Sequence, residues 1–166
     1  MTTHIRAPGL LTQADTVATN ALGTRWTDKS NGKRYMYCYN AGATSWTIGV
    51  PVGVFLTATA VGEASFTAAT QLLVSDGSTD VTAVAGIALG TVATTEYGWL
   101  QVGGFCTNLV TNGTLEASKG GYVADNGVAV IISTEPTAHG IMCVGITNDV
   151  GNLSSNALLK NCWFDY

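Results

Sequence analysis

Apolar and polar side chains alternate along much of this chain, and the clearest run lies between residues 84 and 132. Within residues 97–102 the sequence reads YGWLQV. Successive side chains of a strand point to opposite faces, so Tyr97, Trp99 and Gln101 are predicted on one face, with Leu100 and Val102 on the other. Both faces are apolar, which predicts a central strand.

Similar patterns predict further strands, separated by turns rich in glycine and asparagine. Asn126-Gly127 between two apolar runs predicts a β-hairpin, because both turn residues accept positive φ. Pro51 interrupts another run and predicts an edge or a bulge, since proline donates no ladder hydrogen bond. A short helix is an alternative within residues 60–71. The remaining predicted strands cover residues 34–40, 46–56, 80–89, 122–124, 128–132, 141–146 and 157–164.

These patterns predict an all-β fold, a compact β-sandwich or β-barrel. Residues 1–30 show no regular period and are interpreted as an extended N-terminal arm, followed by a β-rich domain over residues 31–166. Two interpretations of the arm stay open: simple terminal disorder, or a segment that becomes ordered on a neighbouring subunit. In the second case its contacts would include Leu10, Leu11, Val17 and Leu22, and Trp26 would mark where the chain docks onto the core.

Composition narrows the possible partners. Only 11% of the residues are charged and 46% are hydrophobic, so much of the surface must be uncharged, and a permanent protein partner is expected. Seven basic against eleven acidic residues give a net charge of −4, which argues against nucleic acid or an anionic membrane as a partner. No secretory signal or membrane-spanning run is recognisable, so synthesis in the cytoplasm is expected.

Residues 34–40 would place Tyr35, Tyr37 and Tyr39 on one strand face, with Met36 and Cys38 on the other. A tyrosine stripe of this kind is either a half-buried sheet face or a binding surface.

The chain offers little for catalysis. Its two histidines, His4 and His139, have no companions at metal-ligand spacing, and the usual nucleophile, phosphate and dinucleotide motifs are missing. Asp76 and Asp80 favour a turn, with a weak calcium site as the alternative. No enzyme activity, cofactor or metal is therefore expected.

The four cysteines are far apart in sequence and predict neither a zinc site nor a redox pair. Buried thiols are the preferred interpretation, and disulfides remain the alternative. They are Cys38, Cys106, Cys143 and Cys162.

Three segments resemble the small decoration or cement proteins of tailed bacteriophage heads. They are VAGIALGTVATTEYGWLQVGGF, ASKGGYVADNGVAVII and CVGITNDV, within residues 84–150. The resemblance implies a β-rich homotrimer on the outer capsid surface of the virion, bound where several major capsid protein subunits meet, with no cofactor and no reaction. The long polar start and the four cysteines depart from that pattern.

The expected function is therefore adhesive: the protein would join neighbouring major capsid protein subunits and stabilise the shell against internal DNA pressure. Multivalent attachment would raise the effective affinity far above that of a single contact. The alternative is a receptor- or carbohydrate-binding β module of a phage tail or fibre, which would present the tyrosine face or an exposed tryptophan. The candidate contact residues are Leu10, Leu11, Val17, Trp26 and Trp46, whereas Trp99 and Trp163 are assigned to the core.

Overall fold

The computed structural model describes residues 11–42, 44–54, 69–71, 84–110, 120–123, 130–132, 143–145 and 155–159. Within these ranges the chain forms ten strands and no helix, so the predicted all-β fold is confirmed. The strands are β1 (Arg25–Asp28), β2 (Lys33–Tyr39), β3 (Pro51–Val54), β4 (Ala69–Gln71), β5 (Val84–Ala88), β6 (Tyr97–Leu109), β7 (Gly120–Val123), β8 (Val130–Ile132), β9 (Cys143–Gly145) and β10 (Ser155–Leu159).

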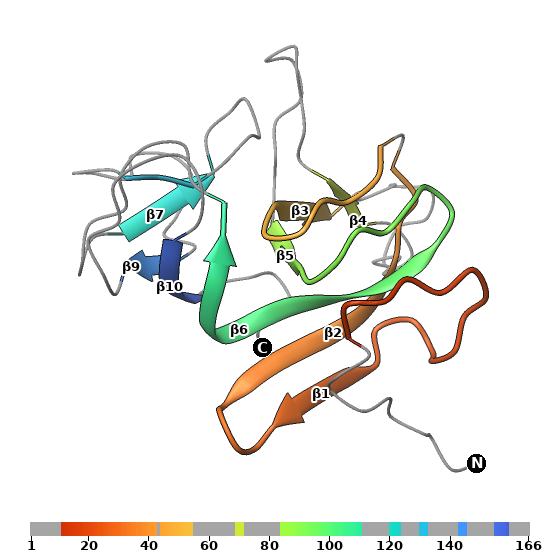
Figure 1. Ribbon diagram of the computed structural model, residues 1–166, viewed down its shortest axis with the longest axis horizontal. Helices are drawn as coiled ribbons and strands as arrows, with labels where there is room; N and C mark the ends of the chain where they lie inside the picture. The colour runs from red at the N-terminus through yellow and green to blue at the C-terminus, as the bar shows by residue number, and fades with distance from the viewer. Residues whose placement is uncertain are drawn as a thin grey trace, which may run out of the picture.

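Strand β6 is central, as its apolar faces predicted. It joins two groups of antiparallel strands, one in the order β1-β2-β6-β5-β3-β4 and the other in the order β6-β10-β9-β7-β8. Figure 1 shows β6 running along β2 and then turning towards β10. The pairings among the described strands do not close into a ring.

The turn in β6 coincides with two glycines. Arg34 pairs with Gly103 and Tyr35 pairs with Gln101, so Val102 is an extra residue in β6 and forms a bulge. Gly104 follows Gly103 and has a φ of +82°. It is also the first residue of β6 that pairs with β10. A conformation that favours glycine therefore lies where the strand changes partners.

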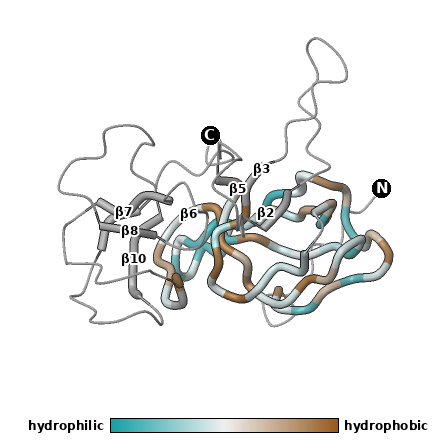
Figure 2. The backbone as a smooth tube through the Cα atoms, turned by 90° about the horizontal axis from the view of Figure 1, so that it is seen from above, coloured by the Kyte–Doolittle hydropathy of each residue, from teal (hydrophilic) through white to brown (hydrophobic). Residues whose placement is uncertain are grey.

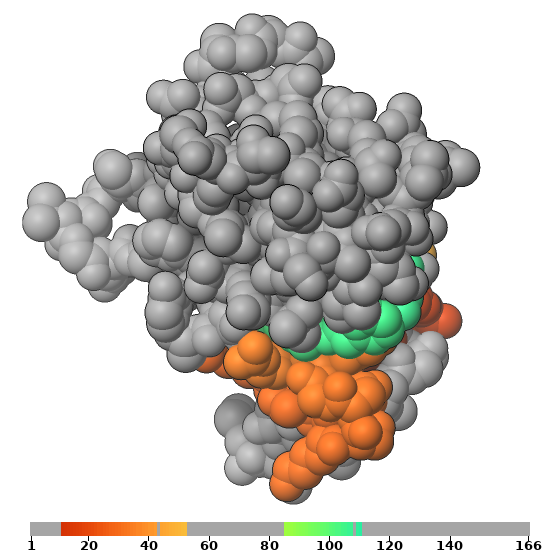
Figure 3. All heavy atoms as spheres, turned by 90° about the vertical axis from the view of Figure 1, so that its left-hand side faces the viewer, coloured from red at the N-terminus to blue at the C-terminus, as the bar shows by residue number. Residues whose placement is uncertain are grey.

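Side chains of β2, β6 and β5 line up in rows on the two faces of this sheet. Tyr35, Gln101 and Ile87 oppose one another in one row, and Met36, Leu100 and Ala88 form the next row on the opposite face. All six are buried. Figure 2 shows apolar stretches recurring along these strands, and Figure 3 shows the orange atoms of the β2 region packed directly against the green atoms of β6.

The predicted bulge, helix alternative and hairpin lie partly within the described residues. Strand β3 begins at Pro51 and its register with β5 shifts between Val52 and Gly53, which confirms the predicted bulge. Residues 69–71 form β4, so the helix alternative is wrong there, and the rest of residues 60–71 lies outside the described residues. Strands β7 and β8 are antiparallel, with Val123 opposite Val130, whereas Asn126-Gly127 itself lies outside the described residues.

Part of the N-terminal region packs against the sheet of its own chain. β1 forms a hairpin with β2 across the predicted boundary at residue 30, and the segment before β1 contacts the same sheet. Apolar side chains of this segment and the tyrosine face of β2 are buried against each other. Residues 1–10 lie outside the described residues, and an arm there stays a prediction.

The bend in β6 gives a first testable prediction. A Cβ on Gly104 would lie 2.8 Å from the carbonyl oxygen of Gly32 and in an unfavourable φ region, so Gly104→Ala should destabilise the protein by about 2–5 kcal/mol. Gly23→Ala is the matched control, because Gly23 has a φ of +76° but no atom within 4 Å of its added Cβ. Urea unfolding should give the control a loss of only about 1–2 kcal/mol. Equal losses would show that the close approach to Gly32 is unimportant.

Candidate functional site

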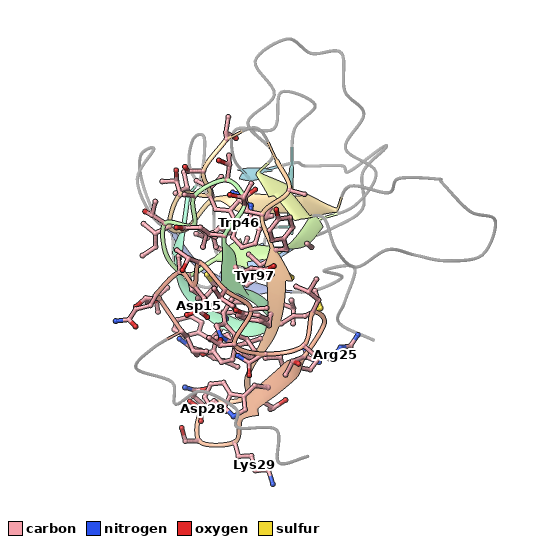
Figure 4. The ribbon with its side chains drawn as sticks, turned by 90° about the vertical axis from the view of Figure 1, so that its right-hand side faces the viewer. Asp15, Arg25, Asp28, Lys29, Trp46 and Tyr97 are labelled. Atoms are coloured by element: carbon pink, nitrogen blue, oxygen red, sulfur yellow. The ribbon has the colours of Figure 1, made fainter. Side chains whose placement is uncertain are left out.

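The N-terminal segment, defined here as residues 11–24, covers the tyrosine face of β2 and β6. Leu11 is buried in a cluster with Tyr35, Tyr37 and Trp99. The backbone of Asp15 exchanges two hydrogen bonds with Tyr97, at 2.9 Å and 2.8 Å, and Figure 4 shows these residues close together. The segment is therefore fixed to the sheet by main-chain hydrogen bonds as well as by apolar contacts.

A small polar cluster reinforces this attachment. The Tyr37 hydroxyl donates to Oδ2 of Asp15 at 2.9 Å, and Oγ1 of Thr19 donates to the same carboxylate oxygen at 2.7 Å. The Thr19 amide in turn donates to the Tyr37 hydroxyl at 3.2 Å. A charged acceptor strengthens such hydrogen bonds, so the cluster links the segment to the centre of β2.

Aromatic rings extend the cover towards β1 and the start of β6. Trp26 stacks on Tyr35 with ring centroids 5.2 Å apart and an interplanar angle of 17°. Tyr97 stacks on Tyr37 at 6.0 Å and also contacts Tyr39 at 4.9 Å. These rings close the tyrosine face against solvent from both sides.

The structure describes four of the five predicted contact residues. Leu11 and Trp46 are buried within the single chain, with 5% and 0% of their surface exposed. Leu11 packs against the tyrosine face, and Trp46 forms an isolated β-bridge with Val92. Contact of these residues with a partner stays a prediction. Trp26 is half-buried, Val17 is 73% exposed, and Leu10 lies outside the described residues.

The tyrosine stripe is not an open binding surface. Tyr35 and Tyr37 are buried beneath the N-terminal segment and β1, whereas Tyr39 is half-buried. The half-buried sheet face was therefore the better interpretation, although its cover comes from the segment that was predicted to be an arm. Trp99 lies in the core, as predicted, and Trp163 lies outside the described residues.

A small pocket opens beside this covered face, and no local sequence pattern predicted it. Its volume is about 90 Å³, and β2, β5, β6 and the turn before β3 line it. Ile48, which is 47% exposed, is one of the lining residues. The available signals were Ile48, which lies between Thr47 and Gly49 just before Pro51, and a glutamine between apolar residues of a central strand.

The described residues hold no group of three or more histidine, cysteine, aspartate or glutamate side chains arranged for a metal. Cys38 and Cys106 are buried thiols, which agrees with the preferred interpretation for these two. Burial raises the pKa of the Cys38 thiol. No helix within the described ranges is long and apolar enough to cross a membrane.

Several other candidate residues lie outside the part of the chain that the structure describes. They are His4, His139, Asp76, Asp80 and Cys162, together with the side chain of Cys143. The site that can be described thus consists of a buried aromatic face, a covering segment with a single charged residue, Asp15, and a small pocket. This arrangement suits binding by surface complementarity.

Comparison with known proteins finds a likeness in structure alone. No family model and no curated protein matches the chain. Among solved structures, the fold is similar to that of the head fiber gp8.5 N base in bacteriophage phi29, with a TM-score of 0.51 and 4% sequence identity. The similarity covers 77% of this chain and 96% of that chain. This likeness shows a shared fold.

The polar cluster predicts a measurable effect of one hydroxyl group. Tyr37→Phe removes a hydrogen bond to a carboxylate and should lower the free energy of unfolding by about 1.5–3 kcal/mol in urea. It should also speed hydrogen exchange at the Thr19 amide. Tyr39→Phe is the control, because the Tyr39 hydroxyl makes no hydrogen bond within the described part of the chain. Equal effects of the two substitutions would contradict the anchoring role of Tyr37.

Buried phenols also predict sensitivity to alkali. Burial raises the pKa of Tyr35 and of Tyr37 above that of an exposed tyrosine. Above a pH of about 10 the unfolded chain loses these protons first, so the free energy of unfolding should fall as the pH rises towards the folded-state values. Urea unfolding at successive pH values checks this. The decline should be shallower in Tyr37→Phe, and an unchanged slope would show that Tyr37 is not responsible.

Proposed function

We propose that this chain is a structural protein of a bacteriophage head, which binds the outer capsid surface as a decoration or cement protein. The observation that carries the proposal is the all-β fold shared with a phage head fiber base over 96% of that chain. The motifs within residues 84–150 support it independently, because they resemble decoration proteins in sequence.

The described surface supports an adhesive role. The N-terminal segment contains one charged residue, Asp15, and its carboxylate already accepts hydrogen bonds from Tyr37 and Thr19. Val17 is the most exposed large apolar side chain among the described residues. An uncharged surface with an exposed apolar residue can be desolvated at low cost, which favours contact with another protein.

The proposed partners are the major capsid protein and two further copies of this chain in a homotrimer. Three linked copies would attach through three sets of contacts, and each contact would raise the effective concentration of the others. Such attachment would oppose separation of neighbouring capsid subunits under internal DNA pressure. No chemical step is needed for this function.

The structural likeness favours one second candidate, the base of a head fibre. In that case the chain would serve as the attachment part of a longer assembly on the head. The carbohydrate-binding alternative loses its main surface, because Tyr35 and Tyr37 are buried.

Binding to phage heads tests the proposal. Purified chain should bind saturably to heads of its own phage from which its gene has been deleted, and electron microscopy should place it on the outer surface. Restoring the protein should raise the temperature at which the heads release DNA. Failure to bind heads would refute the proposal, whereas density continuing outward into a fibre would favour the second candidate.

A surface substitution makes the test more specific. Val17→Asp adds a charge to an exposed position and should weaken binding to heads about tenfold, which corresponds to about 1.4 kcal/mol, without lowering the free energy of unfolding. Thr27→Asp is the control, because it adds the same charge to an exposed position on β1. Equal binding by both variants would exclude Val17 from the contact.

A further inference from the structure

The small pocket has a well-defined floor. Tyr35, Gln101 and Ile87 belong to three neighbouring strands and oppose one another in register. The side-chain nitrogen Nε2 of Gln101 donates to the carbonyl oxygens of Gly103 at 3.2 Å and Phe105 at 3.0 Å. The floor is therefore held in place by the sheet and by the bend of β6.

One wall of the pocket is a turn fixed to two strands. The Gly49 amide donates to the carbonyl oxygen of Ala88 at 2.9 Å, and the Val110 amide donates to the carbonyl oxygen of Gly49 at 2.9 Å. This turn carries Ile48, which remains 47% exposed at the pocket. An apolar side chain in a turn held on both sides offers a preformed contact rather than a mobile one.

The pocket also has a cationic lining residue. Lys33 is half-buried, and within the described part of the chain its ammonium group makes no hydrogen bond or ion pair. The charge of Lys33 acts on the nearby carboxylate of Asp28. That carboxylate accepts hydrogen bonds from Ser30 and Asn31, which together with the charge of Lys33 lower its pKa. Lys33 therefore remains available to a second carboxylate.

Size and chemistry together define the group that would fit. A cavity of about 150 Å³ lined by apolar residues binds benzene, so a pocket of about 90 Å³ accommodates a smaller group, such as a branched aliphatic side chain. Ile48, which is 47% exposed, and the half-buried Leu89 provide apolar contacts for that group above the buried Ile87. The charge of Lys33 favours a carboxylate beside it.

We propose that this pocket binds a short branched aliphatic side chain adjacent to an Asp or Glu carboxylate on the surface of the capsid protein. The inference rests on the proposed function and identifies one chemical feature of the surface that the chain recognises. Charge complementarity at Lys33 favours this partner over the same face of a further copy of the chain, because residues 25–34 carry four basic residues and one acidic residue.

The first experiment uses a small probe and the intact chain. 4-Methylpentanoate carries an isobutyl group and a carboxylate, and 4-methylpentanamide is its uncharged analogue. Nuclear magnetic resonance titration should show saturable shifts at the methyl groups of Ile48, Ile87 and Leu89, with a Kd on the order of millimolar for a ligand of this size. The carboxylate should bind severalfold more tightly than the amide. Shifts that do not saturate, or that spread over the whole surface, would overturn the inference.

Two variants separate the apolar and charged contributions. Lys33→Met keeps the aliphatic stem and should abolish the preference for the carboxylate probe. Ile48→Ser should weaken both probes about fivefold. The matched controls are Lys29→Met, an exposed lysine in the same hairpin, and Val17→Ser, an exposed apolar residue elsewhere. Equal effects of the controls would overturn the assignment to this pocket.

Binding of the same variants to phage heads distinguishes this inference from the proposed function. Both Lys33→Met and Ile48→Ser should weaken binding to heads severalfold, whereas Lys29→Met should leave it unchanged. Normal binding by both pocket variants would overturn the inference while leaving the proposed function intact. Failure of the unaltered chain to bind heads would refute the proposed function and the inference with it.

Discussion

The change of partner along β6 is the constraint on which the rest of this structure depends. One half of the strand lies between β2 and β5, and the other half pairs with β10. A straight strand could not serve both groups, so the backbone turns at Gly103 and Gly104, where an L side chain would meet the Arg34 side chain or the backbone of Gly32. The same turn brings Cys106 and Thr107 to the pocket. Fold and site thus share one backbone feature.

The N-terminal segment follows from the same sheet. The row of tyrosines on β2 and Trp99 on β6 present an aromatic face too large to leave exposed without cost. Leu11, Leu22 and Trp26 cover it, and Asp15 satisfies the buried Tyr37 hydroxyl. Because the face is covered, the outward surface here is formed by small side chains of the segment and by Val17 rather than by Tyr35 and Tyr37.

Local sequence patterns were sufficient for the fold class and for several strands. The alternation in residues 97–102, the bulge near Pro51 and the pairing that flanks Asn126-Gly127 are all short-range signals, and the structure contains each of these pairings or distortions. Position in the core was harder to predict. Leu11 and Trp46 are buried by partners distant in sequence, which no local period records. The pocket was missed for the same reason, since its lining comes from four separate segments.

The scarcity of charge links these features to the proposed adhesive function. A net charge of −4 spread over 166 residues gives little long-range steering, so specificity must come from close fit and from a few well-placed groups. The described surface offers two such elements, the segment around Val17 and the pocket with Lys33 and Ile48. Each is small, and a single copy would bind weakly through either one. Repetition of the same contacts on a symmetric shell would convert weak attachment into stable attachment, because every bound copy holds its linked neighbours close to their own sites.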